Sequence, residues 1–457
     1  MTGGFPGPED TIQVIGAGLA GCEAAWHAAN AGVPVTLIDM KPGSRTPAHH
    51  STDLAELVCS NSLKAMRLTS APGLLKEEMR RLGSIVLSAA DRSAVPAGGS
   101  LAVDRTRFSA LITEAVRSHP LIRIVERTVD EVPGHGIRII ATGPLTQGRL
   151  SESITETLGS KTLHFFDAAA PMVAADSIRR DKVFAQSRYG RGGNDYLNCP
   201  MDREEYEAFW NELVHAETAE VAEFDRKAVF EGCMPIETMA ARGIDTIRFG
   251  PMKPVGLIDP VTGRQPYAVV QLRQDDVSAS IYSLVGFQTR LRFPEQKRVF
   301  SRIPGLENAD FVRYGVMHRN TYIDSPGSLD ASYGVHACPG LYFAGQITGV
   351  EGYIESASSG LLAGINATRT FHRLEPVSLS GDTVAGALAL YVSSGNNRHF
   401  QPMNANYGIL NPIEGRFHGK EERYAAMAER SLQEIDRFIR GLTRDSDMSA
   451  FRGPGLV

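Results

Sequence analysis

The chain has few cysteines, no long apolar run and no secretory leader, and each absence narrows its class. Five cysteines in 457 residues, none at Cys-x-x-Cys spacing, exclude a disulfide framework, a zinc ribbon and a thioredoxin-type site. No stretch approaches the roughly 18 consecutive apolar residues of a membrane span. The first ten residues are rich in glycine and proline and lack the basic and apolar regions of a signal peptide. We therefore expect a cytoplasmic protein that does not enter the membrane.

Charge and histidine patterning exclude two further classes. The 47 basic and 52 acidic residues give a formal net charge of −5, which argues against non-specific coating of nucleic acid but leaves room for a local basic patch. His49 and His50 are adjacent rather than at ligand spacing, so no metal site is expected. The length allows two or three domains with substantial cores.

A glycine motif near the N-terminus carries the strongest signal. Its residues are Gly16, Ala17, Gly18, Leu19, Ala20 and Gly21. The motif follows an apolar segment typical of a buried strand and opens an Ala-rich segment typical of a helix. A second strand pattern ends at Asp39, where a carboxylate can accept hydrogen bonds from ribose hydroxyls. The sequence therefore predicts a dinucleotide site with the pyrophosphate at the helix N-terminus.

Two later apolar segments indicate further strands of the same domain. Residues 136–143 end at Gly143, and residues 340–346 end at Gln346 and precede a small-residue stretch over 356–367. The second segment resembles the closing strand and helix of FAD-binding flavoproteins with two dinucleotide folds, most of which have an acidic residue in place of Gln346. Because the cofactor domain encloses inserted sequence and closes near the C-terminus, we expect FAD rather than NAD as the resident cofactor.

These patterns predict an α/β fold: a Rossmann-like FAD-binding domain of the two-dinucleotide-fold type with an inserted mixed α+β domain. We assign residues 11–90, 136–162 and 331–372 to the FAD-binding domain, 91–135 and 163–330 to an inserted region for the substrate, and 373–457 to a C-terminal helical segment that packs on the FAD domain. A charged amphipathic pattern over 419–442 predicts a long helix within that last segment.

The cysteines differ in their neighbours. Cys22 lies in the Ala-rich helix, and Cys199 and Cys338 each precede a proline, so these three are interpreted as structural residues. Cys59 and Cys233 have polar, turn-forming neighbours, a setting in which a thiolate can act as a nucleophile. Free thiols are commonly buried and inert, and spacing alone does not show that residues 59 and 233 meet.

Blocks of sequence around these cysteines together resemble a known family. The blocks are residues 46–50, 56–63, 188–200, 230–237, 295–300, 313–320 and 345–355. They resemble the folate-dependent tRNA (uracil-C5)-methyltransferases, FAD-dependent enzymes that make ribothymidine at position 54 in the T loop. The resemblance runs from about residue 12 to about residue 370, with one departure at Asp39, where glutamate is expected.

The resemblance implies a role for each of the two cysteines and for several small molecules. Cys233 would be the nucleophile that adds to C6 of uracil, and Cys59 a second active-site thiol that assists or protects. The one-carbon unit would come from 5,10-methylenetetrahydrofolate, with reduced FAD as carrier and reductant and with NADH or NADPH restoring the flavin. The inserted region would bind tRNA, and no obligate protein partner is implied.

The resemblance also extends the cofactor site beyond the glycine motif. The glycine-rich turn after the closing strand would bring backbone close to the isoalloxazine ring. The expected cofactor contacts are Gly16, Ala17, Gly18, Leu19, Ala20, Gly21, Asp39, Gly143, Gly345, Gln346, Gly349, Val350, Glu351 and Tyr353.

One basic and aromatic stretch is a candidate for contact with RNA. Between residues 286 and 302, five cations stand against Glu295 alone, with three phenylalanines interleaved. The cations are Arg290, Arg292, Lys297, Arg298 and Arg302. Such a stretch suits phosphate contact and base stacking, and the alternative is a solvated helix face above core phenylalanines.

Three other activities fit parts of the pattern. A GidA-like flavoprotein modifies wobble uridines of tRNA together with a GTPase partner, but its chains are typically longer at the C-terminus. A small-molecule FAD oxidoreductase would leave the basic stretch and the family-like blocks unexplained. A non-catalytic flavin-binding tRNA chaperone would tolerate replacement of both cysteines. The blocks around Cys59 and Cys233 favour the methyltransferase.

Overall fold

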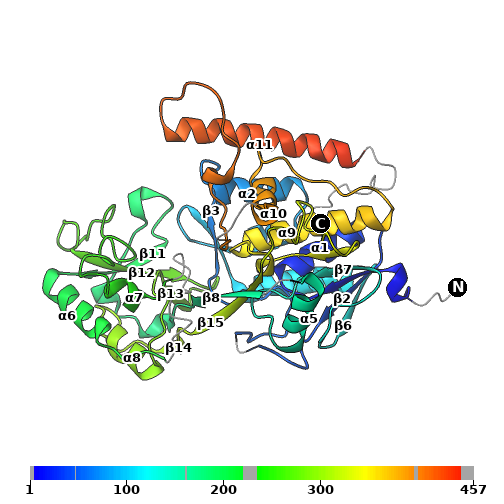
Figure 1. Cartoon of the computed structure of the whole chain (residues 1–457). Helices are drawn as coiled ribbons and strands as arrows, with labels where there is room; N and C mark the ends of the chain where they lie inside the picture. Colours follow the sequence, from blue (N-terminus) through cyan, green and yellow to red (C-terminus); the bar gives the residue numbers. More distant parts are fainter. Residues whose placement is uncertain (1–4, 47, 160–161, 220–233, 396–399, 444–457) are drawn as a thin grey trace.

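The computed structural model describes residues 5–46, 48–159, 162–219, 234–395 and 400–443. The chain forms two bodies joined by a ribbon of two strands, and the C-terminal helices lie over the first body (Figure 1). Cys233 lies outside the described residues.

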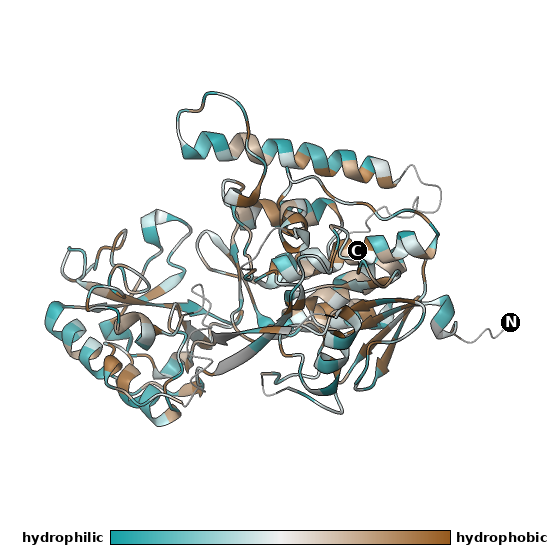
Figure 2. Ribbon diagram, viewed as in Figure 1, coloured by the Kyte–Doolittle hydropathy of each residue, from teal (hydrophilic) through white to brown (hydrophobic). Residues whose placement is uncertain are grey.

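The first body is built on a five-stranded parallel sheet. Its order is β16 (Leu341–Phe343), β7 (Ile137–Ile140), β1 (Ile12–Ile15), β2 (Val35–Asp39) and β6 (Ile122–Glu126). Every neighbouring pair is parallel, and the central strands bury Val, Ile and Leu, as a sheet covered on both faces requires. Figure 2 shows hydrophobic colour concentrated on these strands and on the helices against them.

Two helices of this body, α1 (Leu19–Asn30) and α9 (Tyr353–Phe371), pack in close contact. A Cβ built at Gly360 would stand 2.1 Å from the carbonyl oxygen of Ala20, and one at Gly364 would stand 2.7 Å from that of Ala24. Only glycine permits this approach of two backbones. The small-residue stretch seen in the sequence therefore holds α9 against the helix of the glycine motif.

Residues 91–135 belong to the first body, although the sequence predicts them in the inserted region. Within them, α4 (Arg105–Ser118) packs on α3 (Ile85–Arg92) and β6 pairs with β2. Asp104 caps α4 by accepting the N–H of Arg107 at 2.9 Å. This crossover helix returns the chain to the sheet, because a parallel strand pair needs a connection of such length.

A three-stranded antiparallel sheet belongs to the same body and has the order β3 (Ser62–Ala65), β5 (Ser100–Val103) and β4 (Ala94–Val95). The helix α2 (Ala71–Arg81) follows β3. Its buried Lys76 donates hydrogen bonds of 2.7, 2.8 and 2.9 Å to the carbonyls of Leu63, Ala65 and Pro72. This lysine ties α2 to β3, which directly follows the segment that contains Cys59.

The second body is a six-stranded antiparallel sheet. Its order is β10 (Phe184–Ala185), β11 (Tyr196–Met201), β12 (Ala268–Gln274), β13 (Ile281–Leu284), β9 (Met172–Ala174) and β14 (Phe311–Arg313). Three helices pack against it: α6 (Arg203–Val214), α7 (Ile236–Ala240) and α8 (Phe293–Phe300). Phe209, Phe287 and Phe300 pack together in the core of this body.

The ribbon that joins the bodies consists of β8 (Thr162–Ala168) and β15 (Met317–Ile323). It pairs antiparallel from Thr162 opposite Ile323 to Ala168 opposite Met317. Helix α5 (Gly148–Leu158) leads from β7 to this ribbon.

Two C-terminal helices, α10 (Val384–Ser393) and α11 (Lys420–Leu442), pack against α2. Glu78 of α2 is fully buried, and its carboxylate accepts the N–H groups of Val384 and Ala385 at 2.7 and 2.9 Å. It also accepts the hydroxyl of Ser431 at 2.5 Å. A buried carboxylate requires such donors, and this one fastens both helices to the first body.

Candidate active site beside a dinucleotide cavity

The glycine turn after β1 packs against β7 and α1 too closely for any side chain. Gly16 has a φ of 99°, and a Cβ there would stand 2.5 Å from the carbonyl oxygen of Ala141. A Cβ at Gly21 would stand 1.8 Å from the carbonyl oxygen of Gly16. The first and third glycines of the motif are therefore required by backbone contact, as in a dinucleotide-binding turn.

The start of α1 forms an anion-binding position. Its N-cap is Gly18, which has no side chain to bond the N–H groups of the first turn. These N–H groups and the positive end of the helix dipole suit a pyrophosphate. At the end of β2, Asp39 accepts the N–H of Ala17 at 2.6 Å and the N–H of Lys41 at 2.9 Å. Each carboxylate oxygen keeps a lone pair for a ribose hydroxyl.

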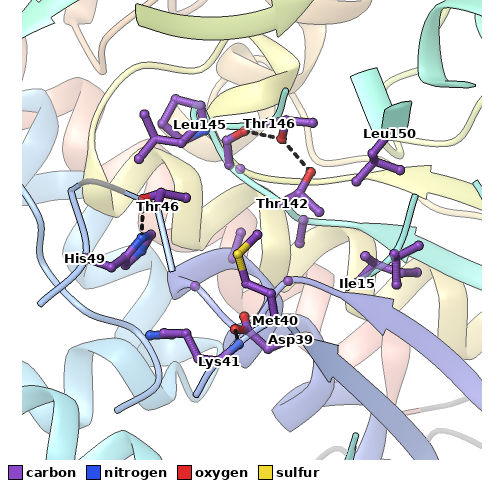
Figure 3. A pocket seen from close by; sticks show the side chains of 18 of the residues that line it. Ile15, Asp39, Met40, Lys41, Thr46, His49, Thr142, Leu145, Thr146 and Leu150 are labelled. Atoms are coloured by element: carbon purple, nitrogen blue, oxygen red, sulfur yellow. Dashed lines mark hydrogen bonds between the residues drawn. The ribbon is translucent and has the colours of Figure 1, made fainter. Parts of the chain in front are cut away.

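A cavity of about 380 Å³ opens at this turn. Among the expected cofactor contacts, its lining includes Gly16, Gly18, Leu19, Ala20, Asp39, Gly143, Gly345, Gln346 and Tyr353. Figure 3 shows Asp39, Thr142 and Thr146 around the cavity. A helix N-terminus, a strand-end carboxylate and a glycine-rich floor fit a dinucleotide such as FAD.

Five expected cofactor contacts lie outside that lining. They are Ala17, Gly21, Gly349, Val350 and Glu351. The turn before α9 packs on the residues that follow position 399: a Cβ at Gly349 would stand 2.3 Å from the ring of Phe400. The N–H of Glu351 donates to the carbonyl of Met403 at 2.8 Å. Contact of this turn with a flavin stays a prediction.

One wall of the cavity comes from the loop after β2, to which the sequence alone assigns no role. Thr46 and His49 share a 2.6 Å hydrogen bond (Figure 3). Burial and the nearby Lys41 lower the pKa of His49, which favours its neutral ring. One oxygen of Glu56 accepts the N–H of His50 at 2.8 Å, and the other is buried without a hydrogen-bond partner among the described residues. The signal in the sequence is that these residues belong to the family-like blocks.

Cys59 lies in a loop that three arginines hold. Arg105 donates to the carbonyls of Leu57 and Cys59 at 2.8 and 3.1 Å. Arg313 donates to the carbonyl of Val58 at 2.7 Å. Hydrogen bonds from an ionised donor are roughly twice as strong as neutral ones, so these contacts fix the course of the backbone.

The third arginine, Arg273, donates to the side-chain oxygens of Ser60 and Asn61, both at 2.9 Å. Arg273 and Arg313 come from β12 and β14 of the second body, whereas Arg105 begins α4 of the first body and pairs with Asp275 at 2.9 Å. The Cys59 loop is therefore held from both bodies. Positive charges around a cysteine favour its thiolate, the reactive form.

Tyr353 connects the Cys59 loop to the cavity. It lines the cavity at the start of α9, and its hydroxyl oxygen accepts the N–H groups of Cys59 and Ser60 at 2.7 and 3.2 Å. Burial raises the pKa of Tyr353, so the phenol keeps its hydrogen at neutral pH. The thiol loop and the dinucleotide cavity thus share one side chain.

The other described cysteines lie in different settings. Cys22 and Cys199 are fully buried, and burial raises the pKa of both thiols. The sulfur of Cys338 accepts a 3.0 Å hydrogen bond from Arg138. Within the described ranges, Cys59 is the cysteine whose loop borders the cavity, and Cys233, the expected nucleophile, lies outside those ranges.

The cations expected to contact RNA are largely paired with carboxylates. The pairs are Arg290 with Glu237, Arg292 with Glu217, Arg298 with Glu295 and Glu212, and Arg302 with Glu212. Lys297 has no such partner among the described residues. Glu212 belongs to α6, so these arginines join two helices of the same layer (Figure 1). Their contact with RNA stays a prediction, and the pairing weakens the electrostatic argument for it.

Neither a metal centre nor a membrane span is found in the part of the chain that the structure describes. No three His, Cys, Asp or Glu side chains there are grouped to hold a metal ion. None of the described helices combines the length and apolar character needed to cross a bilayer.

Comparison with known proteins decides the family. A family model described as glucose inhibited division protein A matches residues 11–375. The methylenetetrahydrofolate--tRNA-(uracil-5-)-methyltransferase TrmFO of Acetivibrio thermocellus is 58% identical over 430 residues, which cover 94% of this chain and 99% of that one. The chain belongs to the TrmFO family. The TrmFO protein of Enterococcus faecalis is 56% identical over 431 residues, again covering 94% of this chain and 99% of that one.

Solved structures support the fold of this TrmFO family member. GidA of Aquifex aeolicus superposes with a TM-score of 0.69 at 16% identity, covering 97% of this chain and 78% of that chain. At this identity the likeness concerns the fold alone. The predicted fold class, a Rossmann-like FAD-binding domain with an inserted domain, is confirmed, as is the family resemblance.

Proposed function

We propose that the protein is a folate-dependent tRNA methyltransferase that methylates C5 of uridine 54 in the T loop of tRNA. The TrmFO relatives, 55–58% identical to this chain, carry the name methylenetetrahydrofolate--tRNA-(uracil-5-)-methyltransferase and match nearly its whole length. Similarity of that extent supports the same one-carbon donor and the same class of RNA substrate.

The dinucleotide cavity would hold FAD. When bound and reduced, FAD supplies the reducing equivalents that turn a methylene group into a methyl group, and NADH or NADPH would restore it. The N–H groups at the start of α1 would bind the pyrophosphate, and Asp39 would accept hydrogen bonds from a ribose. Tyr353 lines the same cavity and orients the thiol loop.

The observation that carries the proposal is the placement of Cys59 beside the cavity through Tyr353. C5 of uracil is a weak nucleophile. A thiolate that adds to C6 forms a C–S bond and moves the electrons of the 5,6 double bond toward C5 and O4, so that C5 can bond to a one-carbon unit. Loss of the C5 proton to a base then expels the thiolate and restores the ring.

Cys233 would be the thiolate that adds to C6, and Cys59 would be the second thiol of the pair. Arg273 and Arg313 bring positive charge to the Cys59 loop and so favour its ionised form. The target uridine is stacked and paired in folded tRNA, so it would have to be extruded to reach these groups.

The test is nucleoside analysis by mass spectrometry after incubation of unmethylated tRNA with the protein, methylenetetrahydrofolate and NADH or NADPH. We expect 5-methyluridine at position 54 that depends on the folate. Cys233→Ala and Cys59→Ala should slow its formation at least about 1,000-fold, a typical loss for a nucleophile, while flavin absorbance is retained.

Cys338→Ala is the matched control, because the sulfur of Cys338 accepts a hydrogen bond from Arg138 and does not line the cavity. This variant should keep full activity. Absence of 5-methyluridine from tRNA that has been incubated with the flavin-loaded protein would contradict the proposal. A modified wobble uridine in the same assay would indicate the GidA-like activity instead.

A further inference from the structure

One face of the six-stranded sheet carries arginines in line with the Cys59 loop. Tyr196 lies opposite Arg273, which lies opposite Ser283, and the row continues through Met172 to Arg313 on β14. Directly opposed residues of antiparallel strands point to the same face. Because both arginines bind the Cys59 loop, this face is the one turned toward the thiol.

From Arg273, a second line of residues on the same face runs along β12, away from the Cys59 loop. Gln271 lies two residues from Arg273, on the same face and about 7 Å along the strand. Its side-chain oxygen accepts a 2.7 Å hydrogen bond from Arg188. Arg188 also donates to the carbonyl of Val255 at 3.0 Å, which fixes it between the sheet and the neighbouring loop. A guanidinium has five N–H groups, so these two bonds leave donors for a ligand.

Beyond Arg188 the surface is aromatic and basic. Tyr189 is 56% exposed and has a φ of 59°, a conformation that bulky residues rarely adopt. Its ring lies against Gly256, where a Cβ would stand 2.8 Å from it. The guanidinium of Arg191 lies 5.7 Å from the centre of the same ring, and Lys253 is exposed on the adjacent loop. Strained, exposed residues of this kind are typical of ligand contacts.

The charges of this surface are not compensated as those near α8 are. Among the described residues, no carboxylate oxygen lies within 4.0 Å of a side-chain nitrogen of Arg188 or Arg191. Asp195, the acid of the same loop, accepts the N–H of Gly98 at 2.6 Å. Near α8, by contrast, four of the five cations have carboxylate partners. Uncompensated arginines beside an exposed aromatic ring suit the phosphates and bases of RNA.

The name "189 surface" is used for Arg188, Tyr189, Arg191 and Lys253. We propose that the 189 surface binds the tRNA segment next to the extruded uridine, with the cations on phosphates and Tyr189 stacked on a base. This inference rests on the proposed function, because it takes tRNA as the substrate and names the surface that holds it. The row through Gln271 and Arg273 then leads from the bound RNA to the Cys59 loop.

Two variants of exposed residues test the 189 surface in the flavin-loaded, full-length protein. Tyr189→Gly removes the ring and suits the positive φ, so the turn is kept. Binding of fluorescently labelled, unmethylated tRNA is measured over a salt series. The Kd should rise about tenfold for Tyr189→Gly, through lost stacking, and about tenfold for Arg191→Ala. The slope of log Kd against log salt should fall by about 1 for Arg191→Ala alone.

Two control variants are needed. One keeps the aromatic ring at position 189, and the other removes an exposed arginine that lies elsewhere on the protein. Tyr189→Phe keeps the ring and should bind tRNA as the unmodified protein does. Arg117→Ala removes an exposed arginine at the end of α4, outside the 189 surface, and should leave the Kd and the salt slope unchanged. Flavin absorbance and the unfolding temperature should match across all variants.

The outcomes distinguish the surface from the function. If the unmodified protein binds tRNA and both variants bind it as tightly as the unmodified protein does, the proposed role of the 189 surface in tRNA binding is overturned. Weakened binding in an Arg298→Ala, Arg302→Ala double variant, without any change in the two 189 variants, would place the contact near α8. Failure of the unmodified protein to bind tRNA and to form 5-methyluridine would overturn the proposed function itself.

Discussion

The dinucleotide turn and the Cys59 loop hold their shapes by different means. In the turn, backbone packs on backbone, since Gly21 lies directly against the carbonyl of Gly16. In the Cys59 loop, polar side chains from distant segments supply the bonds. These side chains are Arg105, Arg273, Arg313 and Tyr353. The contact between Gly21 and Gly16 spans six consecutive residues, whereas Cys59 depends on a hydroxyl 294 positions away.

This difference predicts two kinds of failure. A contact between backbones cannot be relieved by a rotamer change, so a substitution in the turn should remove the cofactor and the local fold together. A loop held by several hydrogen bonds should lose its geometry in steps, because each bond contributes separately. Variants of the Cys59 loop should therefore keep the flavin while they lose the chemistry.

Gly21→Ala should break the turn and has the largest expected effect. Its Cβ would stand 1.8 Å from the carbonyl oxygen of Gly16, which cannot move without displacing β1 and α1. We expect no bound flavin and a loss of more than about 3 kcal/mol in the free energy of unfolding. Flavin absorbance per protein and urea unfolding measure the two quantities.

Gly18→Ala is the matched variant, because a Cβ there meets no protein atom within 4 Å. The flavin-free protein should unfold as the unmodified flavin-free protein does, while the affinity for flavin falls, since this glycine faces the pyrophosphate position. Equal stability of Gly21→Ala and the unmodified protein would refute the steric explanation.

Tyr353→Phe sharpens the comparison because Tyr353 belongs to both regions. The ring that lines the cavity stays, and the hydroxyl that accepts the N–H groups of Cys59 and Ser60 is removed. Two N–H groups without an acceptor cost about 1–3 kcal/mol each, about 2 kcal/mol or more together, so we expect methylation to slow at least about 30-fold at unchanged flavin content. Single-turnover formation of 5-methyluridine measures the rate.

Tyr391→Phe provides the control for Tyr353→Phe. It removes a hydroxyl that donates to the carbonyl of Gln401 at 2.9 Å, outside both regions, and should keep the methylation rate. If Tyr353→Phe lost flavin and activity in equal proportion, the division between cofactor binding and thiol positioning would be wrong.

Glu78→Gln should have the smallest effect on activity, because Glu78 lies outside both regions and acts on stability alone. Burial raises the pKa of Glu78 from 4.5 to about 7. The folded chain then binds more protons than the unfolded chain between these values, so stability that is present below pH 4.5 is lost as the pH rises through 7. The loss is on the order of 3 kcal/mol.

Urea unfolding between pH 4.5 and 8 measures this pH dependence. In Glu78→Gln the part of the slope that comes from this carboxyl should disappear, whatever the overall stability of the variant. An unchanged slope would show that the carboxyl is ionised throughout, held so by the N–H groups of α10 and the hydroxyl of Ser431.

The cofactor turn could be predicted from the sequence because its glycines, the start of α1 and Asp39 all lie within about 30 consecutive residues. The arginines that hold the Cys59 loop could not be predicted in the same way. Arg105, Arg273 and Arg313 are three of 47 basic residues, and only the strand register of the second body places two of them on one face. Cys59 could be predicted as a candidate reactive thiol from its polar neighbours in sequence, but the side chains that hold its loop come from both bodies and could not.

The RNA-binding prediction near α8 shows the limit of counting charges along the chain. The stretch contains Glu295 as its one acid, yet Glu212, Glu217 and Glu237 neutralise it from other segments. The boundary at 91–135 differs for a similar reason, because β6 joins the parallel sheet through its pairing with β2. Both features depend on partners that are distant in sequence.

The chain leaves the first body along β8 and returns along β15, with Thr162 opposite Ile323. The two ends of the whole excursion are therefore about 5 Å apart, as in any antiparallel pair. Replacing everything between them by a short turn would leave each strand of the parallel sheet in place. A gene with this layout can exchange the second body by recombination while the parallel sheet and its dinucleotide turn stay intact, and such an exchange replaces the Arg273 and Arg313 contacts to the Cys59 loop.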